Sequence, residues 1–246
     1  TRVCLSFIDV DDTSGFRALH AARKAKSFAK ELGIDFYVAS QALKGVVDQS
    51  NRIILEQALE EGFIDIIGGL PGKDKNREAE HIDVLFNLAK KYQKRVHVHV
   101  DQLNSPIEKE TELLARKTIR HGLEGQVTAV HSISLAAHEK PYRNEVYKIA
   151  KDTNLSFISC PTAWIDSRRT EVKTPTHNAI TPVDELIEHG LVVAIGSDNI
   201  HDIYKPFSTG DMLTELRFLL ESTHIYNREV LTAIATENGR KVIGIN

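Results

Sequence analysis

The chain has 246 residues, of which 41% are hydrophobic and 26% are charged, and its formal net charge is −3. This composition is ordinary for a globular protein with a large core. No long run of basic residues is present, which argues against nucleic acid and anionic membranes as partners. No apolar run approaches the roughly 18 residues of a membrane-spanning helix. Both cysteines, Cys4 and Cys160, lie in apolar stretches, as reduced thiols of a cytoplasmic protein do.

Short apolar runs typical of strands alternate with helical patterns along the whole chain. Serine caps begin two of the helices, at Ser50 and at Ser105 with Pro106 in the first helical position. In chain order the pattern predicts strand 3–10, helix 15–33, strand 35–40, helix 50–62, strand 64–69, helix 77–92, strand 96–100, helix 105–122, strand 127–131, helix 141–152, strand 156–160, helix 182–190, strand 192–196, and helices 209–221 and 227–238.

This strict alternation predicts βαβ units, and therefore an α/β fold with a parallel sheet. No glycine-rich phosphate loop of a doubly wound sheet is present in the sequence. The predicted strands number seven, which fits a TIM (β/α)8-type barrel lacking one unit. Residues 1–246 are therefore expected to form a single, incomplete barrel domain.

Polar residues follow several of the predicted strands, where a barrel carries its chemistry. In VHVHVDQ, residues 96–102, His97 and His99 share one face of a strand. His131 ends the next strand and Asp198 follows the seventh; with His99 they can bind a divalent metal and activate its water. The alternatives are that Asp198 is a turn or cap residue and that a strand histidine, His97 above all, is a hydrogen-bonded core residue.

Four stretches resemble the amidohydrolase superfamily, in its cytosine deaminase-like and N-isopropylammelide isopropylamidohydrolase-like branch. These stretches are HVDQ at 99–102, VTAVHS at 127–132, GSDNIHDIYKPFSTGDML at 196–213, and ATENGRKVIGI at 235–245. The resemblance implies a metal-dependent hydrolase that cleaves a non-peptide C–N bond of a small nitrogen heterocycle or related amide. It also implies one divalent metal, zinc or iron, as cofactor.

The resemblance further implies a role for each matching residue. His99 would be a metal ligand, and Asp198 would be a ligand that also carries a proton from the metal-bound water. His131 would hydrogen-bond that water or the developing oxyanion. The implied substrate-binding residues are Gln41, Asp101, Asn199 and Tyr204.

The sequence departs from the cytosine deaminase pattern at Gln102. A glutamate stands there in cytosine deaminase and passes a proton to the ring nitrogen, whereas a glutamine has no titrating carboxyl group. Asp101 could replace the glutamate only if its side chain reaches the pocket. Hydrolysis of another ring-borne C–N bond is therefore favoured over deamination of cytosine itself.

A second departure is the absence of the strand that ends in His-x-His in the superfamily. The run at 3–10 resembles the superfamily's second strand, with Phe7 in place of a histidine. The first βα unit and the small β-sandwich are therefore predicted to be missing, and this chain alone to bind metal weakly or not at all. The chain would then be an inactive fragment, or a partner chain or second copy would complete it.

Two alternative functions remain open from the sequence. One is a non-catalytic relative that binds a small ligand at the barrel mouth, as Gln102 and the missing ligands favour. The other is a metal-free barrel enzyme that holds a phosphate at Gly68-Gly69 or Gly196-Ser197, although no basic residue lies next to these glycines in the sequence.

Overall fold

The computed structural model describes residues 2–164 and 180–245. These residues form two compact units. The first unit comprises Thr1–His99 and Arg120–Val127, and the second comprises Val100–Ile119 and Thr128–Asn246. The expectation that the chain is a single domain stays a prediction.

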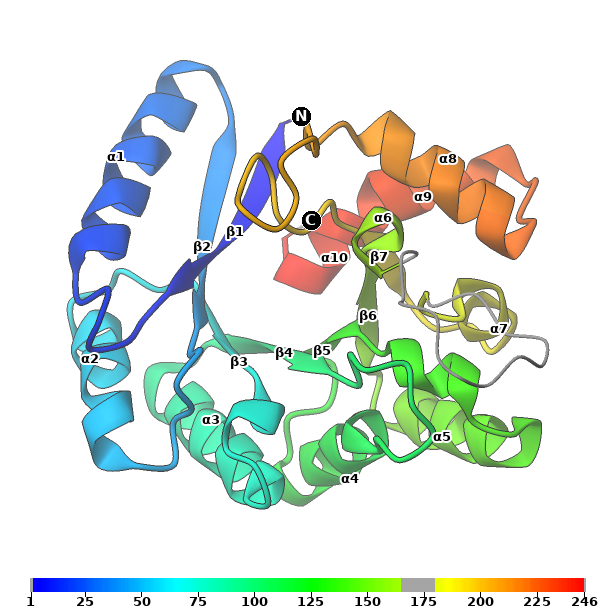
Figure 1. Cartoon of the computed structure of the whole chain (residues 1–246), viewed down its shortest axis with the longest axis horizontal. Helices are drawn as coiled ribbons and strands as arrows, with labels where there is room; N and C mark the ends of the chain where they lie inside the picture. Colours follow the sequence, from blue (N-terminus) through cyan, green and yellow to red (C-terminus); the bar gives the residue numbers. More distant parts are fainter. Residues whose placement is uncertain (1, 165–179, 246) are drawn as a thin grey trace. The chain divides into compact units, whose positions relative to one another are not determined.

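The first unit is built on parallel strands that pair in chain order, with the last residue of β4 in the second unit. The strands are β1 (Val3–Asp9), β2 (Asp35–Gln41), β3 (Ile66–Gly69) and β4 (Arg95–Val100). The helices are α1 (Arg17–Glu31), α2 (Gln49–Glu60), the 3-10 helix η1 (Pro71–Lys73) and α3 (Glu78–Tyr92). Helix α1 packs along β1 and β2 (Figure 1). The core of this unit is fully buried aliphatic and aromatic side chains, including Leu19, Leu55, Ile66, Leu85 and Phe86.

The second unit also alternates parallel strands with helices, and the last two residues of α4 and the first residue of β5 belong to the first unit. The strands are β5 (Val127–His131), β6 (Ser156–Ser159) and β7 (Val193–Ile195). The helices are α4 (Glu110–His121), η2 (Ile133–Ala137), α5 (Lys140–Asp152), α6 (Pro161–Trp164), α7 (Val183–Glu188), α8 (Met212–Thr223), α9 (Arg228–Ala235) and α10 (Glu237–Ile243). Helices α9 and α10 both contact β7 (Figure 1).

Seven parallel strands among the described residues confirm the predicted βαβ architecture. Three predictions about the start, cap and continuity of helices are wrong. The helix expected from 105 begins at Glu110, so Ser105 and Pro106 precede it. Ser50 lies inside α2 and does not cap it. The helix expected over 227–238 is broken at Thr236, whose φ of −130° and ψ of −84° are not helical.

Ser40 holds the carboxyl ends of β2 and β3 together. Only Ala39 and Ile66 are paired in register between these strands, so the ladder is short. The hydroxyl of buried Ser40 donates to the Gly68 carbonyl at 3.0 Å and accepts from the Gly68 N–H at 2.8 Å. A Cβ at Gly68 would lie 2.1 Å from the Ser40 carbonyl oxygen, so this close approach requires glycine.

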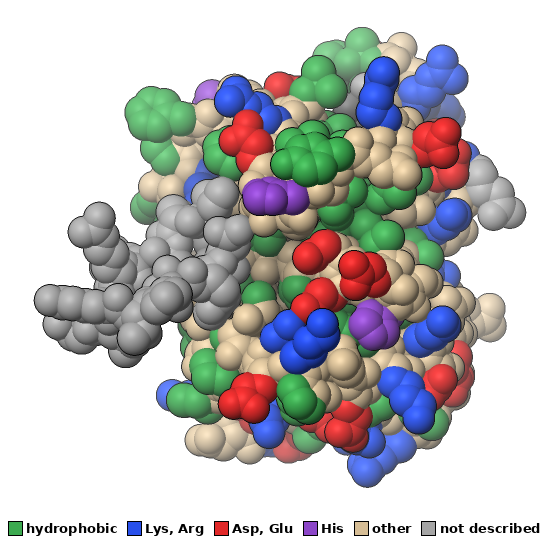
Figure 2. All heavy atoms as spheres, turned by 90° about the vertical axis from the view of Figure 1, so that its right-hand side faces the viewer, with side chains coloured by type: hydrophobic (Ala, Val, Ile, Leu, Met, Phe, Trp, Pro, Cys, Tyr) green, Lys and Arg blue, Asp and Glu red, His purple; other side chains and the backbone are tan. Residues whose placement is uncertain are grey.

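The surface shows no broad field of one charge on the face drawn in Figure 2, where acidic, basic and apolar side chains are interspersed. Within residues 2–164 and 180–245, no helix is long and apolar enough to cross a membrane.

Candidate functional site

In the first unit, the two histidines of β4 are buried beside Phe7 of β1. His97 is fully buried and His99 is 5% exposed, because a strand covered on both faces buries every side chain. The Phe7 and His99 ring centroids are 4.6 Å apart with the rings nearly perpendicular, whereas the Phe7–His97 distance is 6.2 Å. An aromatic hydrocarbon therefore packs against the imidazole that the sequence assigns to a metal.

The protonation state of His99 follows from its burial. Burial lowers the pKa of His99 to about 4, and the backbone carbonyl of Gly69 opposes this shift only in part. His99 is therefore neutral at neutral pH, which is the form of imidazole that binds metal ions.

Gln41 and Asp9 close the paired ends of β2 and β1 in the same unit. The side chain of Gln41 is half-buried there, and its backbone carbonyl accepts from the Val10 N–H at 3.0 Å. Burial and the neighbouring Asp11 raise the pKa of Asp9. The proposed contact of Gln41 with a heterocycle stays a prediction.

Asp101, in the second unit, binds the start of helix α4. Its carboxylate oxygens accept from the backbone N–H groups of Glu110 at 2.7 Å and Thr111 at 3.0 Å. Asp101 is 1% exposed and adopts a φ of +54°. The carboxylate thus satisfies N–H groups that have no partner within the helix, and its predicted substrate contact would add to this structural role. Gln102, beside it, is half-buried.

His131 ends β5 in a turn with unusual backbone angles. His131 and Ser132 have φ values of +73° and +51°, which non-glycine residues rarely adopt. The Thr181 hydroxyl donates to the His131 carbonyl, and the Ser132 N–H donates to the Val100 carbonyl at 3.0 Å. These contacts hold the backbone of the turn, and the side chain of His131 is 2% exposed.

Asp198 lies in the exposed segment after β7, with a φ of +58°. Desolvation by the surrounding protein raises the pKa of Asp198; Lys205 opposes this effect and Asp202 adds to it. Its neighbours include Cys160 at the end of β6, whose thiol pKa is raised by burial and then by the charge of Asp198. A carboxyl group with a raised pKa is suited to carrying a proton near neutral pH.

Asn199 and Tyr204 belong to a loop organised by Asp202. The Asp202 carboxylate accepts from the Asn199 side-chain amide and from the N–H groups of Tyr204 and Lys205, the latter two at 2.9 and 2.7 Å. The ring of Tyr204 is 79% exposed. Tyr204 lines a hollow beside α8, and the predicted substrate contacts of Asn199 and Tyr204 stay predictions.

We call this hollow the α8 pocket, with a volume of about 540 Å³. Its lining consists of Thr162, Tyr204, Lys205, Pro206, Phe207, Ser208, Thr209, Gly210, Asp211, Thr214 and Glu215. Sequence reasoning missed Glu215, a carboxyl group that is only 3% exposed. The signal available in the sequence was an acidic residue four positions before Leu219, on the buried face of α8.

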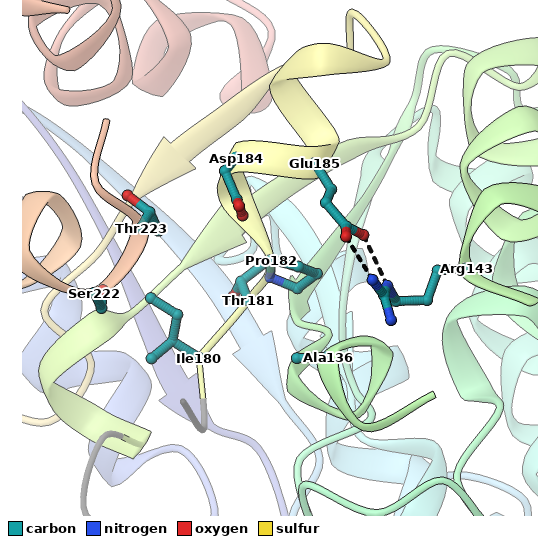
Figure 3. Close-up of a pocket in the computed structure, with 9 residues that line it drawn as sticks. All are labelled: Ala136, Arg143, Ile180, Thr181, Pro182, Asp184, Glu185, Ser222 and Thr223. Atoms are coloured by element: carbon teal, nitrogen blue, oxygen red, sulfur yellow. Dashed lines mark hydrogen bonds and ion pairs between the residues drawn. The ribbon is translucent and has the colours of Figure 1, made fainter. Parts of the chain in front are cut away.

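A second cavity of about 200 Å³ lies beside α5 and α7, and its lining includes Thr181, whose hydroxyl donates to the His131 carbonyl (Figure 3). Arg143 of α5 points toward Glu185 of α7, and its guanidinium donates to the two carboxylate oxygens at 2.7 and 2.5 Å. The hydroxyl of buried Tyr147 also donates to Glu185, at 2.8 Å. These contacts join helices α5 and α7, so the role of this polar cluster is to hold the two helices together.

The described residues do not complete a catalytic metal site. Within residues 2–164 and 180–245, no group of three or more His, Cys, Asp and Glu side chains could hold a metal ion. A catalytic zinc ordinarily has three protein ligands. In the first unit, the phenyl ring of Phe7 packs against His99, and a phenyl ring cannot coordinate a metal.

The chain belongs to the amidohydrolase family, whose sequence profile matches residues 21–245. It is 44% identical over 185 residues to an uncharacterized protein of Haemophilus influenzae, covering 74% of this chain and 66% of that protein. It is 29% identical over 245 residues to N-isopropylammelide isopropyl amidohydrolase of Pseudomonas sp. strain ADP, covering 97% of this chain and 57% of that protein.

A solved structure shows the same fold. The 5-methylcytosine deaminase of Klebsiella pneumoniae, bound to 5-fluorocytosine, matches with a TM-score of 0.90 at 27% identity, covering 99% of this chain and 60% of that one. The chain therefore spans 57% to 66% of the lengths of these relatives. The named relatives are an amidohydrolase and a deaminase, which is the class that the sequence predicts.

Proposed function

We propose that this chain carries the catalytic body of a hydrolase that releases ammonia or an amine from a C–N bond on a small nitrogen heterocycle. The supporting observation is Asp198, whose pKa is raised and which follows β7 in a chain of the amidohydrolase family. The names of two relatives refer to substituted nitrogen heterocycles, and one is bound to such a compound.

In this proposal the chain's own residues divide the work. Asp198 takes a proton from the attacking water and delivers it to the leaving nitrogen, a role that suits a carboxyl with a raised pKa. His131 stabilises the developing oxyanion from its fixed position in the turn. Gln41, Asn199 and Tyr204 contact the heterocycle. Gln102 cannot carry a proton and can only hydrogen-bond.

His99 and Asp198 are the proposed metal ligands, on the strength of the family resemblance. Since the described residues do not bring three ligands together, we propose that further ligands come from outside them or from another chain. Zinc or iron remains the proposed metal.

A second candidate function is binding of a small heterocycle without turnover. The contact between Phe7 and His99 favours it, because a phenyl ring cannot coordinate a metal. The glutamine at position 102 favours it as well, since the proton-transferring carboxyl is absent there.

The two candidates are separated by measuring the release of ammonia or isopropylamine from cytosine and N-isopropylammelide, with zinc or iron supplied. We expect release by the wild type to fall by about 100-fold or more in Asp198→Asn, since the proton carrier is lost. Asp152→Asn, at the exposed end of α5, is the matched control. Equal rates in wild type and Asp198→Asn would contradict the proposal, whereas tight binding of either compound without release would support the second candidate.

A further inference from the structure

The α8 pocket combines a buried carboxyl group with exposed aromatic rings. Glu215 is 3% exposed, whereas Tyr204 and Phe207 in the same lining are 79% and 92% exposed. A cavity of about 540 Å³ falls in the range of small-molecule sites, which are apolar with a few polar groups in fixed positions.

Thr162 fixes the orientation of the Glu215 carboxyl group. Its hydroxyl donates to one carboxylate oxygen at 2.5 Å and its backbone N–H donates to the other at 3.1 Å. Each carboxylate oxygen offers two acceptor positions, so both oxygens retain capacity for a further donor. Two parallel acceptors match the amino N–H and the adjacent ring N–H of an aminopyrimidine that is protonated on its ring nitrogen, since in the neutral ring that nitrogen is an acceptor.

The charges around the pocket select the kind of ligand. Glu215 and Asp211 both line the pocket. Burial raises the pKa of Glu215, the hydrogen bonds from Thr162 oppose this rise, and the negative charges of Asp198 and Asp211 add to it. Lys205 is the one cationic residue in the described lining, and its ammonium group donates to the Ala163 carbonyl at 2.7 Å. An anionic ligand such as a phosphate ester would be repelled, whereas a ligand rich in N–H donors or carrying a positive charge would be attracted.

We propose that Glu215 is a specificity-determining residue that accepts hydrogen bonds from the amino and ring N–H groups of an amino-substituted nitrogen heterocycle, whose ring stacks on Tyr204 or Phe207. The assignment of this pocket to the substrate rests on the proposed function. The pocket itself is built from residues of the second unit alone.

The test is the dissociation constant of 2,4-diaminopyrimidine measured by isothermal titration calorimetry. We expect Glu215→Gln to weaken binding by about tenfold or more, as loss of a charged acceptor does. Glu221→Gln changes an exposed glutamate on the same helix, ion-paired with Arg217, and should leave the affinity within about twofold of wild type. Uracil, which lacks amino groups, should bind more weakly than the diamine to the wild type.

Because Glu215 is buried, Phe207→Ala provides a second variant at a residue that is 92% exposed and does not support the core. It should weaken binding of the diamine without changing the thermal unfolding midpoint. Unchanged affinity in Glu215→Gln and Phe207→Ala, absence of binding to the wild type, or equal affinity for uracil and the diamine would each overturn the inference.

The binding experiment and the activity experiment can have different outcomes, and each outcome overturns a different proposal. Release of ammonia or amine by an enzyme whose affinity does not depend on Glu215 would overturn the role of Glu215 alone. Binding that depends on Glu215, without release under any metal condition, would overturn the hydrolase proposal alone.

Discussion

Phe7 and His99 show how one side chain can limit the chemistry of its neighbour. The phenyl ring contacts the imidazole edge-on, with 4.6 Å between the ring centroids. A phenyl ring has no atom that coordinates a metal, so Phe7 cannot act as a second ligand beside His99. His99 is neutral at neutral pH, so protonation does not oppose coordination there.

Replacing Phe7 by histidine should therefore strengthen zinc binding. We expect the Phe7→His chain to bind zinc about tenfold more tightly than wild type, since a second imidazole lies beside His99. The control is Phe28→His on α1, where the native ring is 62% exposed. Zinc titration by calorimetry measures both, and equal gains in the two variants would show that the effect is unspecific.

Glu185 predicts a pH dependence of stability. Its pKa is lowered by the hydrogen bonds and charge of Arg143 and by the Tyr147 hydroxyl, against the opposing effect of burial. A lowered carboxyl pKa stabilises the fold above the unfolded-state pKa near 4.5, and this contribution disappears as the pH falls through the lower folded-state pKa. Glu185→Gln should therefore cost about 1–2 kcal/mol at pH 7.

Urea unfolding at pH 7 and at pH 3 measures this difference. The destabilisation by Glu185→Gln should shrink at pH 3, which is below the unfolded-state pKa near 4.5. A difference of the same size at both pH values would mean that the ionised state of Glu185 does not stabilise the fold.

At the scale of elements, Asp101 explains why helix α4 begins where it does. Ser105 and Pro106 have the local signature of a helix start, but the first N–H groups of α4 bind the Asp101 carboxylate from nine and ten residues away. A contact across this distance overrides the local signal. Sequence patterns read caps only from adjacent residues, so they misplaced this boundary.

The cap predicts a measurable difference between two single substitutions. Asp101→Ala should lower the free energy of unfolding by roughly 1–3 kcal/mol, because two N–H groups lose their acceptor. Ser105→Ala should lower the free energy of unfolding by only a few tenths of a kcal/mol. The Ser105 hydroxyl accepts one hydrogen bond, from the Ile107 N–H at 3.3 Å in an exposed segment. Equal losses in the free energy of urea unfolding would show that Ser105 contributes as much to the helix start as Asp101 does.

Sequence periodicity located the strands because a strand covered by helices is apolar on both faces, as in VHVHV. The same reasoning placed His99, His131 and Asp198 near strand ends, where the structure has them. It did not predict the hydrogen bonds of Glu215, because their donor, Thr162, lies more than 50 residues earlier. It also could not show that both oxygens of Asp101 are engaged by α4.

At the scale of the whole molecule, the family profile extends over residues 21–245, while the chain spans 57% of N-isopropylammelide isopropyl amidohydrolase. The predicted loss of the first βα unit, and completion of the site by a partner or a second copy, therefore stay proposals. Mass measurement by light scattering would show whether the chain forms the homo-oligomer that the second-copy proposal requires.

Equilibrium zinc binding to the wild-type chain and to His99→Ala tests the central claim, that this amidohydrolase chain contributes ligands to a metal site. Elemental analysis after zinc incubation and dialysis would accompany the titration, with His20→Ala, an exposed histidine of α1, as control. We predict one weak site that His99→Ala abolishes and His20→Ala preserves. Zinc binding of the same affinity by the wild type and His99→Ala would contradict the claim, since His99 would then not be a ligand.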